Sequence, residues 1–199
     1  MGFGYDGDGD PTTYKGQALT FDPEDRLTQC GSAQQGGYSA DGLRAWKRSS
    51  SGSRAYFLHD GDRPVCEVSA DGVLPATNTF GADGLISRRA GGASAFYAFD
   101  ERGCVAQRLS SAGAVQSSEL YDAYGSRAGT AGQANPWGYM GQWGYYTDAE
   151  TGLILCTDSF YDPALGRFLT RAPIGYDGGL NLYGYTGNNP VNQIDPDGT

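Results

Sequence analysis

Residues 141–199 read GQWGYYTDAETGLILCTDSFYDPALGRFLTRAPIGYDGGLNLYGYTGNNPVNQIDPDGT. In this stretch Tyr, Phe, Leu and Ile alternate with Gly, Asn, Asp and Pro, and no helical period is present. Such a pattern favours short strands joined by tight turns over helices. The residues that precede it look like short hairpin units that lead into it.

The composition of the whole chain points in the same direction. Glycine accounts for 32 of the 199 residues and tyrosine for 14, which favours an all-β protein of many short strands. The net charge of -9 argues against non-specific binding to nucleic acid or to an anionic membrane. The apolar runs are too short to span a bilayer, and the first residues do not resemble a signal peptide.

A loose unit repeats through residues 1–127: an aromatic residue, an Asp/Gly turn and a second short strand. The leading aromatic residues are Tyr5, Phe21, Tyr38, Tyr56, Phe80, Phe99 and Tyr121. Asp-Gly supplies the positive φ of a tight hairpin turn, and each aromatic residue can pack across to a neighbouring strand. Because one hairpin cannot bury its own face, we expect successive hairpins to add edge to edge into one curled antiparallel sheet. The predicted division is 1–127 for these repeats, 128–137 for a loop and 138–199 for a terminal element.

The sequence indicates no cofactor and no metal site. Cys30, Cys66, Cys104 and Cys156 lack metal-ligand spacing, so we expect isolated thiols, with a disulfide as the alternative. The single histidine, His59, could complete a zinc site only with three of these cysteines.

The first residues contain a run of alternating aspartates, Asp6, Asp8 and Asp10. A calcium loop is one interpretation, but Pro11 and Gln17 stand where an EF-hand requires Gly and Glu. We therefore predict a hairpin turn here.

Several motifs resemble those of one protein family. The segment 21–27, FDPEDRL, is similar to the YD repeat of Rhs proteins, with Asp25 in the place of a Gly. Segments 144–153, 160–169, 173–175, 178–183, 187–192 and 195–198 resemble the Rhs-repeat-associated core domain. The resemblance implies a hollow β-shell that encloses an unfolded C-terminal toxin, with the core domain as a plug at one end. It also implies a secreted or cell-surface protein whose partners are the rest of the shell and, in longer relatives, that toxin.

In many members of this family the core domain cuts the toxin free as an aspartyl autoprotease. Such a reaction needs two carboxyl groups that share a proton. The family's arginine and two aspartates correspond to Ser159, Ala172 and Asp195, so Asp195 is the sole acid retained. Asp158 or Asp177 could stand in only from different backbone positions, and Thr199 replaces the leucine that ends the family signature.

We therefore expect a structural fragment of an Rhs-type shell, with a degenerate protease site and no toxin domain. Exposed sheet edges predict self-association or a larger partner. Two alternatives stay open: an active self-cleaving aspartyl protease, and a carbohydrate- or cell-binding module. The latter would use surface aromatic residues, among which Trp46, Trp137 and Trp143 are available.

Overall fold

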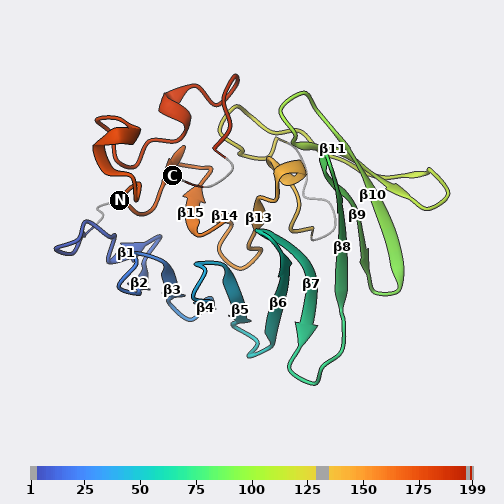
Figure 1. Cartoon of the computed structure of the whole chain (residues 1–199), viewed down its shortest axis with the longest axis horizontal. Helices are drawn as coiled ribbons and strands as arrows, with labels where there is room; N and C mark the ends of the chain where they lie inside the picture. The colour runs from blue at the N-terminus through green and yellow to red at the C-terminus, as the bar shows by residue number, and fades with distance from the viewer. Residues whose placement is uncertain (1–3, 129–134, 196–197, 199) are drawn as a thin grey trace.

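The computed structural model describes residues 4–128, 135–195 and 198, and the regular secondary structure of these residues is almost entirely β-strand (Figure 1). The first sheet contains β1 (Thr13–Tyr14), β2 (Gln17–Phe21), β3 (Leu27–Cys30), β4 (Gln34–Tyr38), β5 (Arg44–Ser49), β6 (Arg54–Asp60), β7 (Arg63–Ser69), β8 (Ala76–Gly81), β9 (Gly84–Ala90), β10 (Ala93–Phe99), β11 (Val105–Ser110) and β12 (Val115–Ser118). The second contains β13 (Tyr146–Thr147), β14 (Ile154–Cys156), β15 (Ser159–Asp162) and β16 (Arg167–Phe168). The described residues also form three short 3₁₀ helices: η1 (Gly141–Trp143), η2 (Gly175–Gly178) and η3 (Thr186–Asn188).

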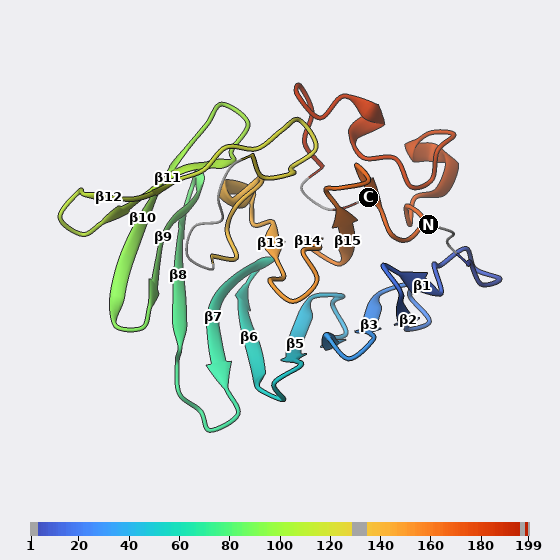
Figure 2. The ribbon, with the colours of Figure 1, turned by 180° about the vertical axis from the view of Figure 1, so that it is seen from behind.

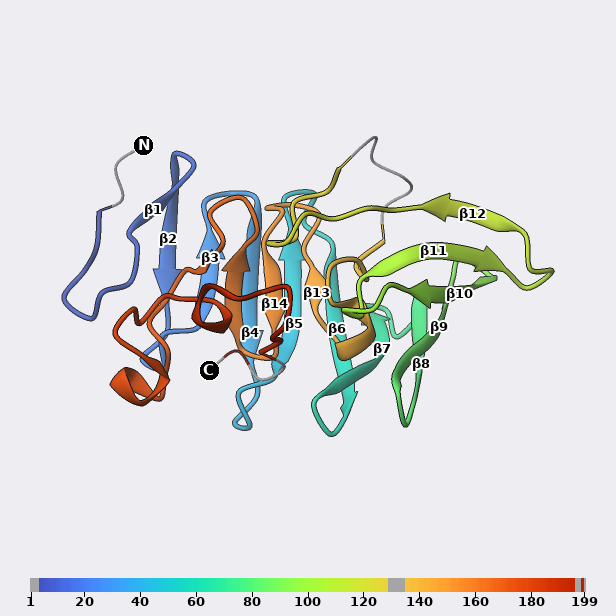
Figure 3. The ribbon, with the colours of Figure 1, turned by 90° about the horizontal axis from the view of Figure 1, so that it is seen from above.

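Both sheets are antiparallel and follow chain order, so every strand pairs with its neighbour in sequence. The twelve-stranded sheet is open, with β1 and β12 at its two ends. It curls, and the second sheet lies on its concave side (Figures 1 and 3). The prediction of a curled antiparallel sheet of successive hairpins is confirmed. We call residues 135–195 the plug.

One five-residue turn recurs along the sheet and explains the repeat. At Asp100, the Gly103 amide donates to the Asp100 carbonyl at 3.0 Å, and the Asp100 amide donates to the Cys104 carbonyl at 2.9 Å. The same two hydrogen bonds occur in turns that begin at Asp6, Asp22, Ser39, Ser49, Ser69, Ser110 and Asp122. The fourth residue has positive φ, as a hairpin of this type requires.

The predicted units and the observed turns differ in two respects. The units led by Tyr56 and Phe80 end in two-residue turns, between β6 and β7 and between β8 and β9. The turns at Ser49 and Ser69 were not predicted, because serine replaces aspartate and no aromatic residue precedes it. Serine can form the same contact as aspartate in such a turn: at Ser110, the Oγ accepts the Ala114 amide at 3.1 Å.

The hydrophobic core is shared by the sheet and the plug. Phe57, Leu85 and Val105 of the sheet pack in one cluster with Trp137 and Leu155 of the plug. A second cluster, within the plug and the last turn of the repeats, contains buried tyrosines: Tyr121, Tyr139, Tyr145, Tyr161 and Tyr185. Neither layer buries its apolar face without the other. The predicted boundary at 128–137 stays a prediction, and residues 129–134 lie outside the described part of the chain.

The plug also contacts the N-terminal hairpin. The orange-red segment after β16 lies near this blue hairpin in both broad views (Figures 1 and 2). The Tyr183 hydroxyl donates to the Gly9 carbonyl at 2.7 Å, and Arg167 donates to the Tyr5 hydroxyl at 3.1 Å. In the part of the chain that the structure describes, no helix is long and apolar enough to cross a membrane.

Candidate functional site

A buried carboxylate fastens the plug to the sheet. Asp148, which is fully buried, accepts hydrogen bonds from Arg44 Nη1 at 2.5 Å, Gln34 Nε2 at 2.8 Å and Lys47 Nζ at 3.0 Å. Burial alone would raise the pKa of Asp148, but the charges of Arg44 and Lys47 outweigh it and hold the pKa below its usual value. The carboxylate is therefore ionised, and it links three sheet residues to the plug.

The guanidinium of Arg44 packs between two aromatic rings in addition to its contact with Asp148. Its guanidinium lies 4.6 Å from the centre of the Phe57 ring and 4.7 Å from that of Tyr146. Phe57 belongs to β6 and Tyr146 to β13, so the cation is sandwiched between the two layers. This arrangement fixes how the plug sits against the centre of the sheet.

A second polar cluster joins the layers farther along the sheet. Glu67 Oε1 accepts from Arg88 at 2.7 Å and from the Tyr146 hydroxyl at 3.2 Å. Asn78 Oδ1 accepts from Arg88 at 3.0 Å and from the indole of Trp137 at 3.0 Å. Because buried polar groups need partners, this cluster also specifies one docking position.

Two of the three family protease positions line one cavity of about 280 Å³. Ser159 opens β15, and Ala172 follows β16; the two residues face the same space with Asp158, between the plug and the turn that joins β2 to β3. The complete lining is Glu24, Asp25, Arg26, Asp158, Ser159, Thr170, Arg171, Ala172, Pro173, Gly175 and Leu182. The site has a cavity of useful size, but Ser159 brings no positive charge and Ala172 no carboxylate.

Asp195 does not line this cavity, and its carboxylate shapes the backbone. Its Oδ1 accepts the Gly198 amide at 3.0 Å, which is a turn-forming contact. A Cβ on Gly198 would lie 3.1 Å from Ser159 Cβ and 2.6 Å from the Cys156 carbonyl, so the segment packs directly on β15. The structure thus brings Ser159 and Ala172 to one cavity, and it packs the turn that begins at Asp195 on the neighbouring strand β15. Thr199 lies outside the described residues.

The possible substitutes for the missing acid differ in position. Asp158 lines the cavity and accepts from the Ser159 hydroxyl at 3.2 Å, whereas Asp177 is exposed on η2 and does not line it. Asp25, Arg26 and Arg171 line the cavity too, although the motif comparison did not single them out as site residues. The available signal was Asp25, which departs from glycine in its repeat.

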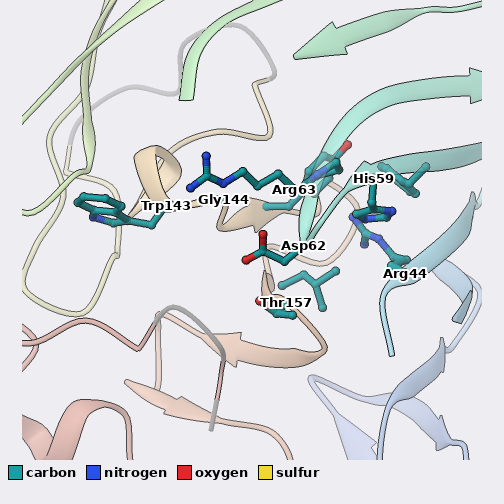
Figure 4. Close-up of a pocket in the computed structure, with 11 residues that line it drawn as sticks. Arg44, His59, Asp62, Arg63, Trp143, Gly144 and Thr157 are labelled. Carbon is teal, nitrogen blue, oxygen red and sulfur yellow. The ribbon is translucent and has the colours of Figure 1, made fainter. Parts of the chain in front are cut away.

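A smaller cavity, of about 30 Å³, lies between the β6–β7 turn and the plug (Figure 4). Arg63 reaches from that turn toward Trp143 and Gly144, while Arg44 and His59 lie on the other side. Burial and the charge of Arg44 lower the pKa of His59, so its imidazole is neutral at neutral pH. The space is about that of one water molecule, which is too small for an organic substrate.

The other sequence predictions concern cysteines, metals and aromatic residues. All four cysteines are free thiols, and within residues 4–128, 135–195 and 198 no group of three potential ligands could hold a metal ion. Asp6 Oδ1 accepts the amides of Asp8 and Asp10, as the hairpin-turn interpretation predicts. Trp137 is buried, so it cannot stack on a surface ligand.

No family model matches the chain. Among curated proteins it is 32% identical to the tRNA3(Ser)-specific nuclease WapA of Bacillus spizizenii, over 98% of this chain and 9% of that protein. It is 51% identical over 53 residues to the double-stranded DNA deaminase toxin A of Burkholderia cenocepacia, which is 27% of this chain and 4% of that protein.

Among solved structures, the crystal structure of TcdB2-TccC3-TEV superimposes with a TM-score of 0.80 at 24% identity. The Photorhabdus luminescens Tc holotoxin pore with the TccC3-D651A mutation gives 0.75 at 25% identity. Each match covers 98% of this chain, but only 11% and 10% of the respective solved chain. The chain therefore spans about a tenth of the length of WapA and of these solved chains.

Proposed function

The chain belongs to the Rhs and YD-repeat proteins, and on that premise we propose that it is a structural, encapsulating part of an Rhs-type toxin-delivery shell. In this role the curled sheet forms part of the shell wall, and the plug closes one end of the enclosed space. The buried Asp148 cluster supports the proposal most directly. This cluster holds the plug in one position against the sheet. A domain that closes the end of a shell needs such a fixed position, whereas a catalytic domain that moves freely does not.

We also propose a partner for the sheet edges. The rest of an Rhs shell pairs with the sheet at β1 or β12, which stand at the two ends of the strand order. A toxin is the enclosed cargo in the longer protein. A protein of this kind acts outside the cell that makes it, so we propose a secreted or cell-surface location.

The autoprotease site is proposed to be inactive. An aspartyl protease uses one carboxylate as the base for water and one carboxylic acid for the leaving amine. Of the family positions only Asp195 keeps an acid, and its Oδ1 is engaged by the Gly198 amide. Asp158 starts from another backbone position, and catalytic geometry tolerates a displacement of only about 0.5 Å.

A fusion with a small stable passenger placed after Thr199 tests this proposal. Intact-mass measurement is expected to find the unmodified fusion at full length after prolonged incubation. Ser159→Arg together with Ala172→Asp is expected to restore cleavage near residue 199, because the two changes return the missing positive charge and carboxylate.

The two single variants and the double variant carrying Asp195→Asn are the matched controls, and all three should stay intact. Cleavage of the unmodified fusion would show an active protease. A double variant that stays intact would show that these positions do not form a degenerate protease site.

A further inference from the structure

A further cavity lies away from the protease positions, on β9 to β12. It has a volume of about 190 Å³ and extends to Asn135, where the plug begins. Among the described residues, Arg88 and Arg108 are the only charged side chains that line it. The whole chain has 23 acidic and 14 basic residues, so a cavity with two arginines and no acid runs against the general charge balance.

The strand register places both arginines on the face that meets the plug. Arg88 pairs with Ala95 across β9 and β10, and Arg108 pairs with Tyr97 across β10 and β11. Ala95 and Tyr97 are two residues apart on one strand, so their side chains and those of their partners share a face. The Tyr97 hydroxyl donates to Asn135 Oδ1 at 2.9 Å, which identifies this face as the concave one.

Small side chains leave the space beside Arg88. Ala93 pairs with Ala90 next to the pair of Arg88 with Ala95, and all three alanines line the cavity. A longer side chain at any of these positions would occupy the volume in front of the guanidinium. The cavity is therefore a consequence of the sequence at these paired positions.

Arg88 is held in one position and keeps donors for another group. Its Nη1 donates to Glu67 Oε1 at 2.7 Å and to Asn78 Oδ1 at 3.0 Å. Both hydrogen bonds use Nη1, whereas a guanidinium has five N–H donors on three nitrogens. The side chain is 13% exposed, so little conformational freedom would be lost when a ligand binds.

The charges favour a carboxylate over a more highly charged anion. Glu67 already offsets the charge of Arg88, so the cavity has less positive charge than two isolated guanidinium groups would give. A singly charged carboxylate suits this balance better than a doubly charged phosphate. Its two oxygens also match the planar fork of donors on one guanidinium.

We propose that the cavity on β9 to β12 binds a carboxylate through the guanidinium groups of Arg88 and Arg108. The carboxylate can come from a small organic acid or from an acidic side chain of a polypeptide on the concave side. The inference rests on the lining of the cavity and is independent of the proposed shell function.

An NMR titration of the full chain, followed at the Nε–H groups of Arg88 and Arg108, tests the proposal. The probes are acetate, N-acetylglutamic acid α-amide and, as a neutral control of similar shape, N-acetylglutamine amide. Both carboxylates are expected to shift these signals and the Ala95 amide to saturation, whereas the glutamine compound should not. Tighter binding of the glutamic acid compound than of acetate would identify a peptide side chain as the source, and equal binding would identify a free acid as sufficient.

Three variants separate this site from a general effect of charge. Arg108→Gln should weaken carboxylate binding about tenfold or more. Ala95→Leu keeps both charges but fills the space, and should weaken binding similarly. Arg89→Gln is the matched control, because Arg89 is exposed and alternates with Arg88 to the opposite face; it should bind as the parent does. Thermal unfolding of each variant verifies that it is folded.

Three results would overturn the proposal. The first is that neither carboxylate shifts the arginine signals, or that the glutamine compound shifts them equally. The second is an equal loss of binding in Arg108→Gln and Arg89→Gln. The third is tighter binding of inorganic phosphate than of either carboxylate, which would contradict the choice of ligand.

Discussion

Asp148 brings a negative charge into the core, where three side chains of the sheet meet it. Burying an ion pair costs desolvation energy, so such a cluster adds more to the choice of one docked position than to total stability. The sequence shows Asp148 only as part of a family motif. Its pairing with Arg44, 104 residues away, depends on how two layers dock, and no local pattern predicts that.

Replacing Asp148 by Asn should destabilise the protein by about 3–5 kcal/mol, because Arg44 would stay buried without its counter-charge. Urea denaturation measures the loss. Glu150→Gln is the matched control, since Glu150 pairs with the same Lys47 at a partly exposed position; it should cost no more than about 1 kcal/mol. Equal losses in the two variants would contradict the account of Asp148.

Two turn glycines with similar backbone angles should respond differently to alanine. Gly52 has a φ of 86°, and a Cβ there would make only an ordinary contact, with Arg48 Nη2 at 3.8 Å, so Gly52→Ala should cost about 1–2 kcal/mol from the left-handed backbone alone. Gly125 has a φ of 93°, and a Cβ there would lie 2.7 Å from the Tyr139 ring. Gly125→Ala should therefore cost about 1–3 kcal/mol more. Thermal unfolding of the two variants side by side measures the difference, and equal costs would argue against the contact with Tyr139.

At the scale of elements, the turn chemistry was the most predictable part of the fold. Asp-x-x-Gly fixes a positive φ and a local acceptor, so the turns at Asp100 and Asp122 follow from four residues each. The turns at Ser49 and Ser69 were not predicted, because serine is common in other contexts. The position of the plug on the concave face could not be predicted from local sequence patterns, because it depends on contacts between distant residues such as Trp137 and Asn78.

Trp137 is the side chain of the plug on which docking should depend most. It is buried, and its ring packs edge-on against Phe80 and Tyr146, with centroids 5.7 and 5.3 Å away. Trp137→Ala should cost about 3–5 kcal/mol. Trp143→Ala, at a side chain that is 39% exposed, should cost less than half as much by the same urea measurement. A larger loss at Trp143 would contradict the assignment of Trp137 as the anchor.

At the scale of the whole molecule, the described strands of the first sheet form an arc that begins at β1 and ends at β12. Hairpin repeats predict such a sheet, and the aromatic residues predict that one face is covered. They do not predict which strands the plug packs against, because the clusters around Asp148 and Glu67 assemble only in the folded chain. An open arc with a covered concave face is suited to continue into a longer wall.

The concentration dependence of the molar mass, measured by light scattering, tests the central claim of an open-edged shell segment most directly. We predict that the isolated chain associates as its concentration rises, through pairing at β1 and β12. Thr13→Lys together with Val115→Lys, at exposed positions on these two strands, should reduce the association without unfolding the protein. A chain that stays monomeric at every concentration, with and without these changes, would contradict the account.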